Sequence, residues 1–377
     1  PEDWQAIAFG YWEKQKYGSA GDAYAKAPPT ALNLYRAGRG AQLDGKTQTA
    51  ISRYEALIQA FPQAKETGLA MMRLVSLVEK PETAIAYLDQ VTTRFADRAP
   101  EAMMAKADRL LGQNQPEAAL KIQQAILAEH SNSEEAATIR WQQVEEHLKN
   151  GNTQSAWEWA RQLAAENPDS ELAPQAAFWV GRWAADLGKP DAAKQSYEYV
   201  LATYPESYYA WRSAVLLGWD VGDFSTVRQK LPQVVKPTWQ PDPLAGSDAV
   251  KELYRLGQDR DAWDLWQVEF TNRVEPTVAE QFTDGLMRLG VNDNLDGLFM
   301  LSSLDLREQP EERQQVKQIK QDINYWYALY AFPYAETIEQ WAQQRQLNPM
   351  LVTALIHQES RFEAKIESIA GAKGLMQ

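Results

Sequence analysis

Apolar and polar residues recur regularly along the first two thirds of the chain. Five similar segments begin with alanine, place apolar residues on one side of a helix and end in an aromatic or polar residue, often followed by proline. Their first residues are Ala50, Ala84, Ala119, Ala156 and Ala193, so successive starts lie 34, 35, 37 and 37 residues apart. Short turn-forming stretches such as "DGKT" and "GKPD" precede them. The pattern predicts repeated pairs of helices.

This spacing resembles the tetratricopeptide repeat, a helix–turn–helix unit of about 34 residues. Alanine at the start of the second helix lets the first helix approach closely, and a large apolar residue one or two turns later fills the groove. Stacked units of this kind bury a continuous core and curve into a superhelix. We therefore expect an all-α fold in which residues 1–235 form a tetratricopeptide-like α-superhelix.

Six tryptophans of this region allow two interpretations. Their rings could offer flat faces to sugars or peptides, or they could belong to the core. Trp179 and Trp183 are four residues apart on one helix face, as a packing stripe requires, which favours the core. The six residues are Trp157, Trp159, Trp179, Trp183, Trp211 and Trp219.

The repeat pattern stops at a proline-rich stretch. Pro237, Pro241 and Pro243 with Gly246 predict a loop or boundary, and we assign residues 236–248 to this linker. Helical patterns resume after it, so residues 249–330 are predicted to form a second helical region.

Composition excludes several classes of function. The net charge of −13 argues against nucleic acid or an anionic membrane as the main electrostatic partner. The 377 residues include no cysteine and three histidines, and no H-E-x-x-H motif occurs, so we predict no metal site and no cofactor. The chain contains no run of about 18 apolar residues, so we predict no membrane span.

One motif is a weak match to a phosphate-binding loop. The segment "GAQLDGKT", residues 40–47, satisfies G-x-x-x-x-G-K-[ST], but such a loop must follow a β-strand. A helical pattern precedes it here, and Asp44-Gly45 forms a natural turn, with Thr47 able to cap the next helix. We therefore do not predict phosphate binding.

The last predicted helix contains a carboxylate in an unexpected place. Asn348 as the cap and Pro349 at the first helical position predict its start. The apolar residues expected on one face are Val352, Leu355, Ile356 and Phe362. Glu359 follows the first three of them by seven, four and three residues, so it falls on that face. Partial burial raises the pKa of a carboxyl group and suits a general acid. The alternative is a solvated glutamate at the edge of the apolar face.

The residues after Glu359 favour the first interpretation. The sequence reads E-S at Glu359-Ser360 and then S-x-x-G-A-x-G-L-M-Q from Ser368 to Gln377. This pattern resembles the catalytic module of the soluble lytic transglycosylases, and every position of it matches. The preceding "LYAFPY" and the earlier "SYYAWRSAVLLG" also resemble segments of that family.

The resemblance implies a bacterial periplasmic enzyme whose export signal is absent from this chain. It cleaves peptidoglycan between N-acetylmuramic acid and N-acetylglucosamine and forms 1,6-anhydromuramic acid. The family has a superhelical domain, a linker helical domain (here 249–330) and a goose-lysozyme-like catalytic domain, of which residues 331–377 would be the N-terminal part. Glu359 would be the single general acid and base. Contacts to the substrate would come from Ser360, Ser368, Gly374, Leu375, Met376 and Gln377. The implied partners are glycan strands and other cell-wall enzymes.

Two other functions stay open. One is a muramidase of related fold, in which water attacks and a second carboxylate is usual. The other is a non-enzymatic superhelical scaffold that binds peptidoglycan or protein. A lysozyme-like domain needs roughly 100 residues, and only 46 run from Phe332 to Gln377. We therefore expect the intact enzyme to be active and the 377-residue chain alone to be inactive.

Overall fold

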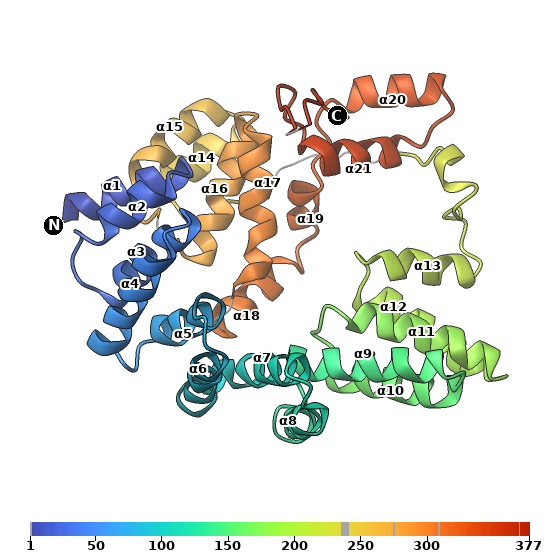
Figure 1. Cartoon of the computed structure of the whole chain (residues 1–377). Coiled ribbons are helices and arrows are strands. Elements are labelled where there is room, and N and C mark those ends of the chain that lie inside the picture. The colour runs from blue at the N-terminus through green and yellow to red at the C-terminus, as the bar shows by residue number, and fades with distance from the viewer. Residues whose placement is uncertain (1, 235–240, 274–275, 308–309, 369) are drawn as a thin grey trace. The chain divides into compact units, whose positions relative to one another are not determined.

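The computed structural model describes residues 2–234, 241–273, 276–307, 310–368 and 370–377 (Figure 1). Within these ranges the regular elements are helices, and the β-structure consists of one isolated antiparallel bridge between Glu367 and Lys373. The predicted all-α class is confirmed. The chain divides into two compact units, Pro1–Asp220 and Val221–Gln377.

The first unit consists of consecutive helices that pack against their neighbours in sequence. Its elements are α1 (Glu2–Glu13), α2 (Tyr17–Tyr24), α3 (Ala31–Leu43), α4 (Thr47–Ala60), α5 (Lys65–Leu77), α6 (Pro81–Arg94), a short 3-10 helix η1 (Ala96–Arg98), α7 (Ala99–Gly112), α8 (Pro116–Glu129), α9 (Glu134–Lys149), α10 (Thr153–Glu166), α11 (Ala173–Asp186), α12 (Pro190–Thr203) and α13 (Tyr208–Leu216).

The five alanines that begin the predicted repeats are all buried, none more than 5% exposed. Seven residues after each, two helical turns later, lies a fully buried apolar side chain: Leu57, Val91, Ile126, Leu163 and Val200. Four residues further on lie the C-caps of α4, α6, α8, α10 and α12, which are Phe61, Phe95, His130, Asn167 and Tyr204. The predicted packing of alanine and a large apolar residue is thus confirmed.

Glycine allows the two helices of a repeat to approach most closely at two places. A Cβ atom on Gly38 would lie 2.6 Å from the ring of Tyr54, and one on Gly181 would lie 2.5 Å from the ring of Tyr197. Each tyrosine ring therefore packs directly on the backbone of the preceding helix, where any other residue would collide with it.

The tryptophans mostly serve packing. Trp157 and Trp183 are buried, and Trp179 stacks on Trp183 with ring centroids 5.3 Å apart. Trp159 and Trp211 are half-buried, whereas Trp219 is 58% exposed. The core interpretation is confirmed for the first three residues and is wrong for Trp219.

A buried polar network joins the turns of two adjacent repeats. Arg140 is only 1% exposed and donates to the carbonyl oxygen of Ser131 and to Oδ1 of Asn167, both at 2.6 Å. It also forms an ion pair with Glu166. Asn167 in turn donates to the carbonyl oxygen of Ser131 at 3.0 Å. The guanidinium group thus holds one repeat end to the next.

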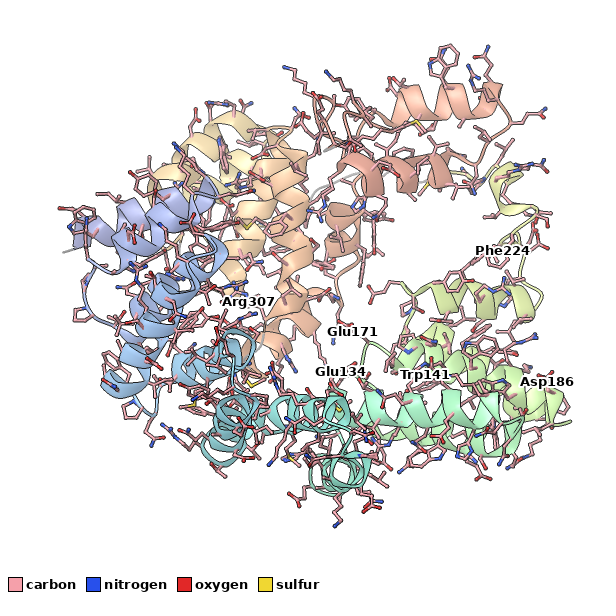
Figure 2. All side chains as sticks on the ribbon, viewed as in Figure 1. Glu134, Trp141, Glu171, Asp186, Phe224 and Arg307 are labelled. Atoms are coloured by element: carbon pink, nitrogen blue, oxygen red, sulfur yellow. The ribbon has the colours of Figure 1, made fainter. Side chains whose placement is uncertain are left out.

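A second polar contact lies at the start of α9 (Figure 2). Glu134 accepts a hydrogen bond from Oγ of Ser170 at 2.9 Å. Burial raises the pKa of Glu134, and the negative charge of Glu171 acts in the same direction. Trp141, two turns along α9, packs against the neighbouring apolar clusters.

The segment that resembles a phosphate-binding loop contains the end of α3, a turn at residues 44–46 and the start of α4. α3 precedes the turn, as predicted, and Gly45 adopts a left-handed backbone (φ 75°). Thr47 is the first residue of α4 rather than its cap, and Lys46 at the cap position makes no side-chain capping bond. The prediction of Thr47 as the cap was wrong.

The second unit has two short 3-10 helices and eight α-helices among its described residues. They are η2 (Val227–Gln229), α14 (Asp248–Arg255), α15 (Asp259–Glu269), α16 (Val278–Gly290), α17 (Asn294–Ser302), η3 (Ser303–Leu306), α18 (Pro310–Ile319), α19 (Ile323–Leu329), α20 (Ala335–Gln344) and α21 (Pro349–Ser360).

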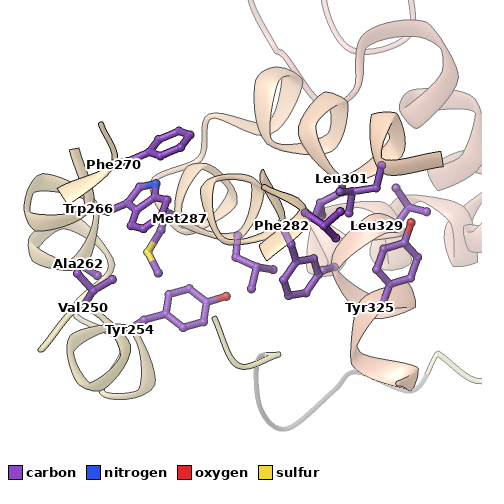
Figure 3. Close-up of a cluster of buried hydrophobic side chains, with 14 of the residues drawn as sticks. Val250, Tyr254, Ala262, Trp266, Phe270, Phe282, Met287, Leu301, Tyr325 and Leu329 are labelled. Atoms are coloured by element: carbon purple, nitrogen blue, oxygen red, sulfur yellow. The ribbon is translucent and has the colours of Figure 1, made fainter. Parts of the chain in front are cut away.

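Helices α14 to α19 share an apolar core (Figure 3). Trp266 stacks on Phe270 with ring centroids 4.9 Å apart, and its Nε1 donates to Oδ1 of buried Asp284 at 2.9 Å. Phe282 stacks on Tyr325 at 6.3 Å, further along the same core. Helices α20 and α21 bury residues in a separate cluster, in which Ile338 and Ile356 pack with Leu298 of α17.

The boundaries predicted at residues 235, 248 and 330 stay predictions. Residues 236–240 of the predicted linker, with Pro237, lie outside the described residues. Packing within the second unit continues across residue 330, because Leu298 of α17 shares a buried cluster with Ile338 of α20 and Ile356 of α21.

Candidate functional site

Helix α21 begins where the sequence predicts. Asn348 is its cap, and its Oδ1 accepts from the backbone N–H groups of Met350 at 2.9 Å and Leu351 at 3.4 Å. Pro349 occupies the first helical position. The amide nitrogen of the Asn348 side chain also donates to the carbonyl oxygen of Val227 at 3.0 Å, which ties the helix start to the 3-10 helix η2.

The buried face of α21 differs from the predicted one. The buried residues are Pro349, Thr353, Ile356 and Ser360, with spacings of four, three and four. Val352 is half-buried, and Leu355 is 43% exposed. Glu359, four residues after Leu355, therefore lies on the exposed side of the helix. The expected partial burial of Glu359 was wrong, because packing on α17 and α20 selects the face that carries Thr353 and Ser360.

Two hydroxyl groups make this buried face possible. Oγ1 of Thr353 donates to the carbonyl oxygen of Pro349 at 2.8 Å, and Oγ of Ser360 donates to that of Ile356 at 3.0 Å. Since each hydroxyl bonds to its own helix, both side chains can be buried without a lost hydrogen bond. A search for apolar residues alone misses such a face.

The chain turns sharply after Glu359. Arg361 and Phe362 both have a left-handed backbone, with φ of 47° and 62°. Phe362 is 1% exposed and belongs to the cluster of Leu298, Ile338 and Ile356. Glu359 is thus the penultimate residue of α21, and an anchored turn follows it.

The glycine-rich stretch after this turn is a small hairpin. Ser368 donates its N–H to the carbonyl oxygen of Ala372 at 2.8 Å, and its Oγ accepts from the N–H of Ala372 at 3.0 Å. The N–H of Gly374 donates to the carbonyl oxygen of Ile366 at 3.1 Å. Gly371 and Gly374 take left-handed conformations, φ 84° and 88°, which side chains disfavour.

The motif residues that follow differ in accessibility. Leu375 is half-buried and packs against the cluster around Phe362, whereas Met376 is 49% exposed. Ser368, Gly374 and Gln377 are half-buried, and Ser360 is 2% exposed. The structure therefore leaves Met376 the most open of the predicted contact residues and closes off Ser360.

His357, one of the three histidines of the chain, lies in α21 among aromatic side chains. Its ring lies 6.0 Å from the rings of both Tyr330 and Phe362. Burial lowers the pKa of His357, and the positive charge of Arg361 contributes, against a hydrogen bond to the backbone of Leu329 that raises it. In the sequence, the only sign that His357 packs against other side chains is its position next to the apolar residue Ile356.

Two absences concern the described residues. Among them, no three His, Cys, Asp or Glu side chains gather as a metal site would require. The helices found there are too short or too polar to cross a membrane.

Two protein-family models match segments of the chain. Residues 336–377 match the Transglycosylase SLT domain, and residues 32–64 and 175–207 match the Tetratricopeptide repeat. No curated protein matches the chain.

Solved structures that match the chain include a tetratricopeptide repeat protein and lytic transglycosylases. The 70 kDa soluble lytic transglycosylase from Escherichia coli is 14% identical, with a TM-score of 0.39 over 98% of this chain and 63% of that chain. A complex of the 70-kDa soluble lytic transglycosylase with bulgecin A is also 14% identical, with a TM-score of 0.40 over 100% and 64%. Pseudomonas aeruginosa pilF is 12% identical, with a TM-score of 0.34 over 57% and 96%.

The family matches coincide with the two patterns found in the sequence. The repeats lie in the first unit, and the SLT match covers α20, α21, the turn and the hairpin. The chain thus carries segments similar to tetratricopeptide repeats and a segment similar to the Transglycosylase SLT domain, which confirms its resemblance to the soluble lytic transglycosylases.

Proposed function

We propose that the natural protein containing this chain is a peptidoglycan lytic transglycosylase with Glu359 as its single general acid and base. The observation that carries the proposal is the place of Glu359 within the SLT match. It is an exposed carboxyl group in the last turn of α21. A reacting glycan can reach a group in that position.

The proposed reaction needs one carboxyl group. Protonated Glu359 donates its proton to the oxygen that links N-acetylmuramic acid to N-acetylglucosamine, and the bond from this oxygen to the anomeric carbon breaks. The 6-hydroxyl of the same muramic acid then attacks the anomeric carbon and gives its proton to the Glu359 carboxylate. A 1,6-anhydro ring forms, no water is consumed, and Glu359 regains its proton. An internal hydroxyl is effective because it has a high local concentration.

Because Glu359 is exposed, the substrate itself would have to shield its carboxyl group from water. A general acid must be uncharged before it reacts, and removal of water favours the uncharged carboxyl group. We propose that the bound sugar ring displaces water from Glu359, as closure of an active site does in other enzymes. Contacts to the glycan would come from Ser368, Gly374, Leu375, Met376 and Gln377.

The wider assignment is part of the same proposal. We place the protein in the periplasm, where its glycan substrate and other cell-wall enzymes would be its partners. The predicted domains at 1–235, 249–330 and 331–377 would then be the superhelical, linker and catalytic domains. The chain spans 63% of the Escherichia coli transglycosylase chain, so the activity is proposed for the natural protein.

Digestion of purified glycan strands in water labelled with oxygen-18 tests the proposal. We expect products one water lighter than hydrolytic fragments, without the label, and their loss in Glu359→Gln. The control is Glu363→Gln, four residues later, whose Oε1 accepts from the N–H of Lys365 at 3.0 Å. The amide oxygen of glutamine keeps that bond, so activity should persist. The 377-residue chain is assayed in parallel.

Other outcomes identify the alternatives. Labelled reducing ends would mean that water attacked, and the protein would be a muramidase. The second alternative is a non-enzymatic scaffold, a role with which the tetratricopeptide match is compatible. In that case both the natural protein and its variants would bind glycan strands or protein and would release no product.

A further inference from the structure

The turn after α21 has a backbone that needs support. Arg361 and Phe362 are successive left-handed residues, with φ of 47° and 62°, and neither is glycine. Each such residue costs roughly 1–2 kcal/mol and persists only where its surroundings fix it. Strain of this kind gathers at functional sites. The question is which contacts fix this turn.

Ser360 supplies two of those contacts through one hydroxyl. Its Oγ donates to the carbonyl oxygen of Ile356 at 3.0 Å and accepts from the N–H of Phe362 at 3.1 Å. Its carbonyl oxygen accepts from the N–H of Glu363 at 2.9 Å. The hydroxyl thus links the last turn of α21 to the second of the two left-handed residues.

The buried ring of Phe362 supplies the third contact. It is 1% exposed in the cluster of Leu298, Ile338 and Ile356. Its burial favours the turn by about 2 kcal/mol, which offsets a large part of the backbone cost. Ser360 orients the Phe362 amide, and the cluster holds the ring.

We infer that Ser360 is a positioning residue that fixes the direction of Glu359, an assignment that rests on the proposed function. Its side chain is 2% exposed, and its hydroxyl already donates one hydrogen bond and accepts another. A sugar hydroxyl has no access to it. The structure thus replaces the predicted contact with substrate by a contact with the turn beside Glu359.

The physical reason lies in how helices end. The last carbonyl groups of a helix lack partners within it, so the last turn frays unless other groups bond to it. Here the N–H of Arg361 donates to the carbonyl oxygen of His357 at 3.1 Å, within the turn that Ser360 closes. Glu359 lies in that last turn. A displacement of about 1 Å at a reacting group can cost about 100-fold in rate.

The same helix offers a matched control. Thr353 lies two turns earlier on the same buried face, is 7% exposed, and donates its hydroxyl to the carbonyl oxygen of Pro349 at 2.8 Å. No described hydrogen bond links its hydroxyl to a residue beyond the helix end. Thr353→Val and Ser360→Ala each remove one bond from hydroxyl to carbonyl, but only Ser360→Ala also releases the Phe362 amide.

Steady-state kinetics of the natural protein give the first test. We expect Ser360→Ala to lower kcat about 10- to 100-fold with KM within about twofold, because substrate contacts persist while the acid is misplaced. Thr353→Val should leave kcat within about twofold. A raised KM with unchanged kcat in Ser360→Ala would make Ser360 a substrate ligand and overturn the inference. An equal fall of kcat in Thr353→Val would also overturn it.

Amide hydrogen exchange gives a test that does not need activity. In the 377-residue chain, the Phe362 amide should exchange at least about tenfold faster in Ser360→Ala and at an unchanged rate in Thr353→Val. Unchanged exchange in Ser360→Ala would overturn the inference whatever the kinetics show. If Glu359→Gln stays active, the proposed function fails instead, and Phe362 exchange alone decides whether Ser360 fixes the turn.

Discussion

The repeats and the last helix bury their faces by different means. In the repeats, alanine and a large apolar residue seven positions later are buried, as Ala156 and Leu163 illustrate. In α21, the buried face contains Thr353 and Ser360, whose hydroxyls bond to the helix backbone, while apolar Leu355 faces outward. Hydrophobic periodicity therefore predicts the first kind of helix correctly and the second incorrectly.

The largest effect should come from a pair of leucines that differ in this respect. Leu163→Ala removes a fully buried side chain and should lower the free energy of unfolding by about 3–5 kcal/mol. Leu355→Ala removes a side chain that is 43% exposed and should cost less than about 1 kcal/mol. Urea denaturation followed by circular dichroism measures both. Equal costs would mean that Leu355 is buried as the sequence predicted.

The second prediction concerns the buried network of the repeats. Arg140→Ala should lower the free energy of unfolding by about 2–3 kcal/mol, since Asn167 loses its donor in a site that water cannot reach. Lys194→Ala is the control, because its ion pair with Glu198 is exposed and 3.7 Å long. That variant should change stability by less than about 0.5 kcal/mol. A small effect of Arg140→Ala would show that the network is not needed to join the repeats.

Some features of the fold and the candidate site could be predicted from the sequence, and others depend on contacts between distant residues. Local sequence motifs are enough to identify the first alanine of each repeat, the helix cap at Asn348 and the candidate acid Glu359. The direction of Glu359 depends on which face of α21 meets Leu298 and Ile338, and those residues lie far away in sequence. The left-handed pair Arg361 and Phe362 carries no glycine to reveal it.

A third prediction uses the pH dependence of the region around Glu359. Burial holds the pKa of His357 below its ordinary value of 6.5, so the folded state binds its proton less tightly than the unfolded state does. The stability present above pH 6.5 is therefore lost as the pH falls from 6.5 toward the lower folded pKa. Thermal unfolding between pH 7.5 and 5 should show less loss in His357→Gln than in the native chain. Parallel curves would contradict this assignment.

The smallest effect should come from the one ion pair within the hairpin of residues 366–374, as far as the structure describes it. Nζ of Lys373 lies 3.2 Å from the carboxylate of Glu367, and both side chains are more than half exposed. Water and salt screen such a pair, so Lys373→Gln should cost less than about 0.5 kcal/mol, and added salt should remove even that. The two hydrogen bonds between Ser368 and Ala372, one of which the serine hydroxyl accepts, should hold the hairpin instead. Amide exchange at Ala372 should therefore stay slow in Lys373→Gln and become faster in Ser368→Ala. The reverse order would mean that surface charge, rather than the serine, shapes this part of the site.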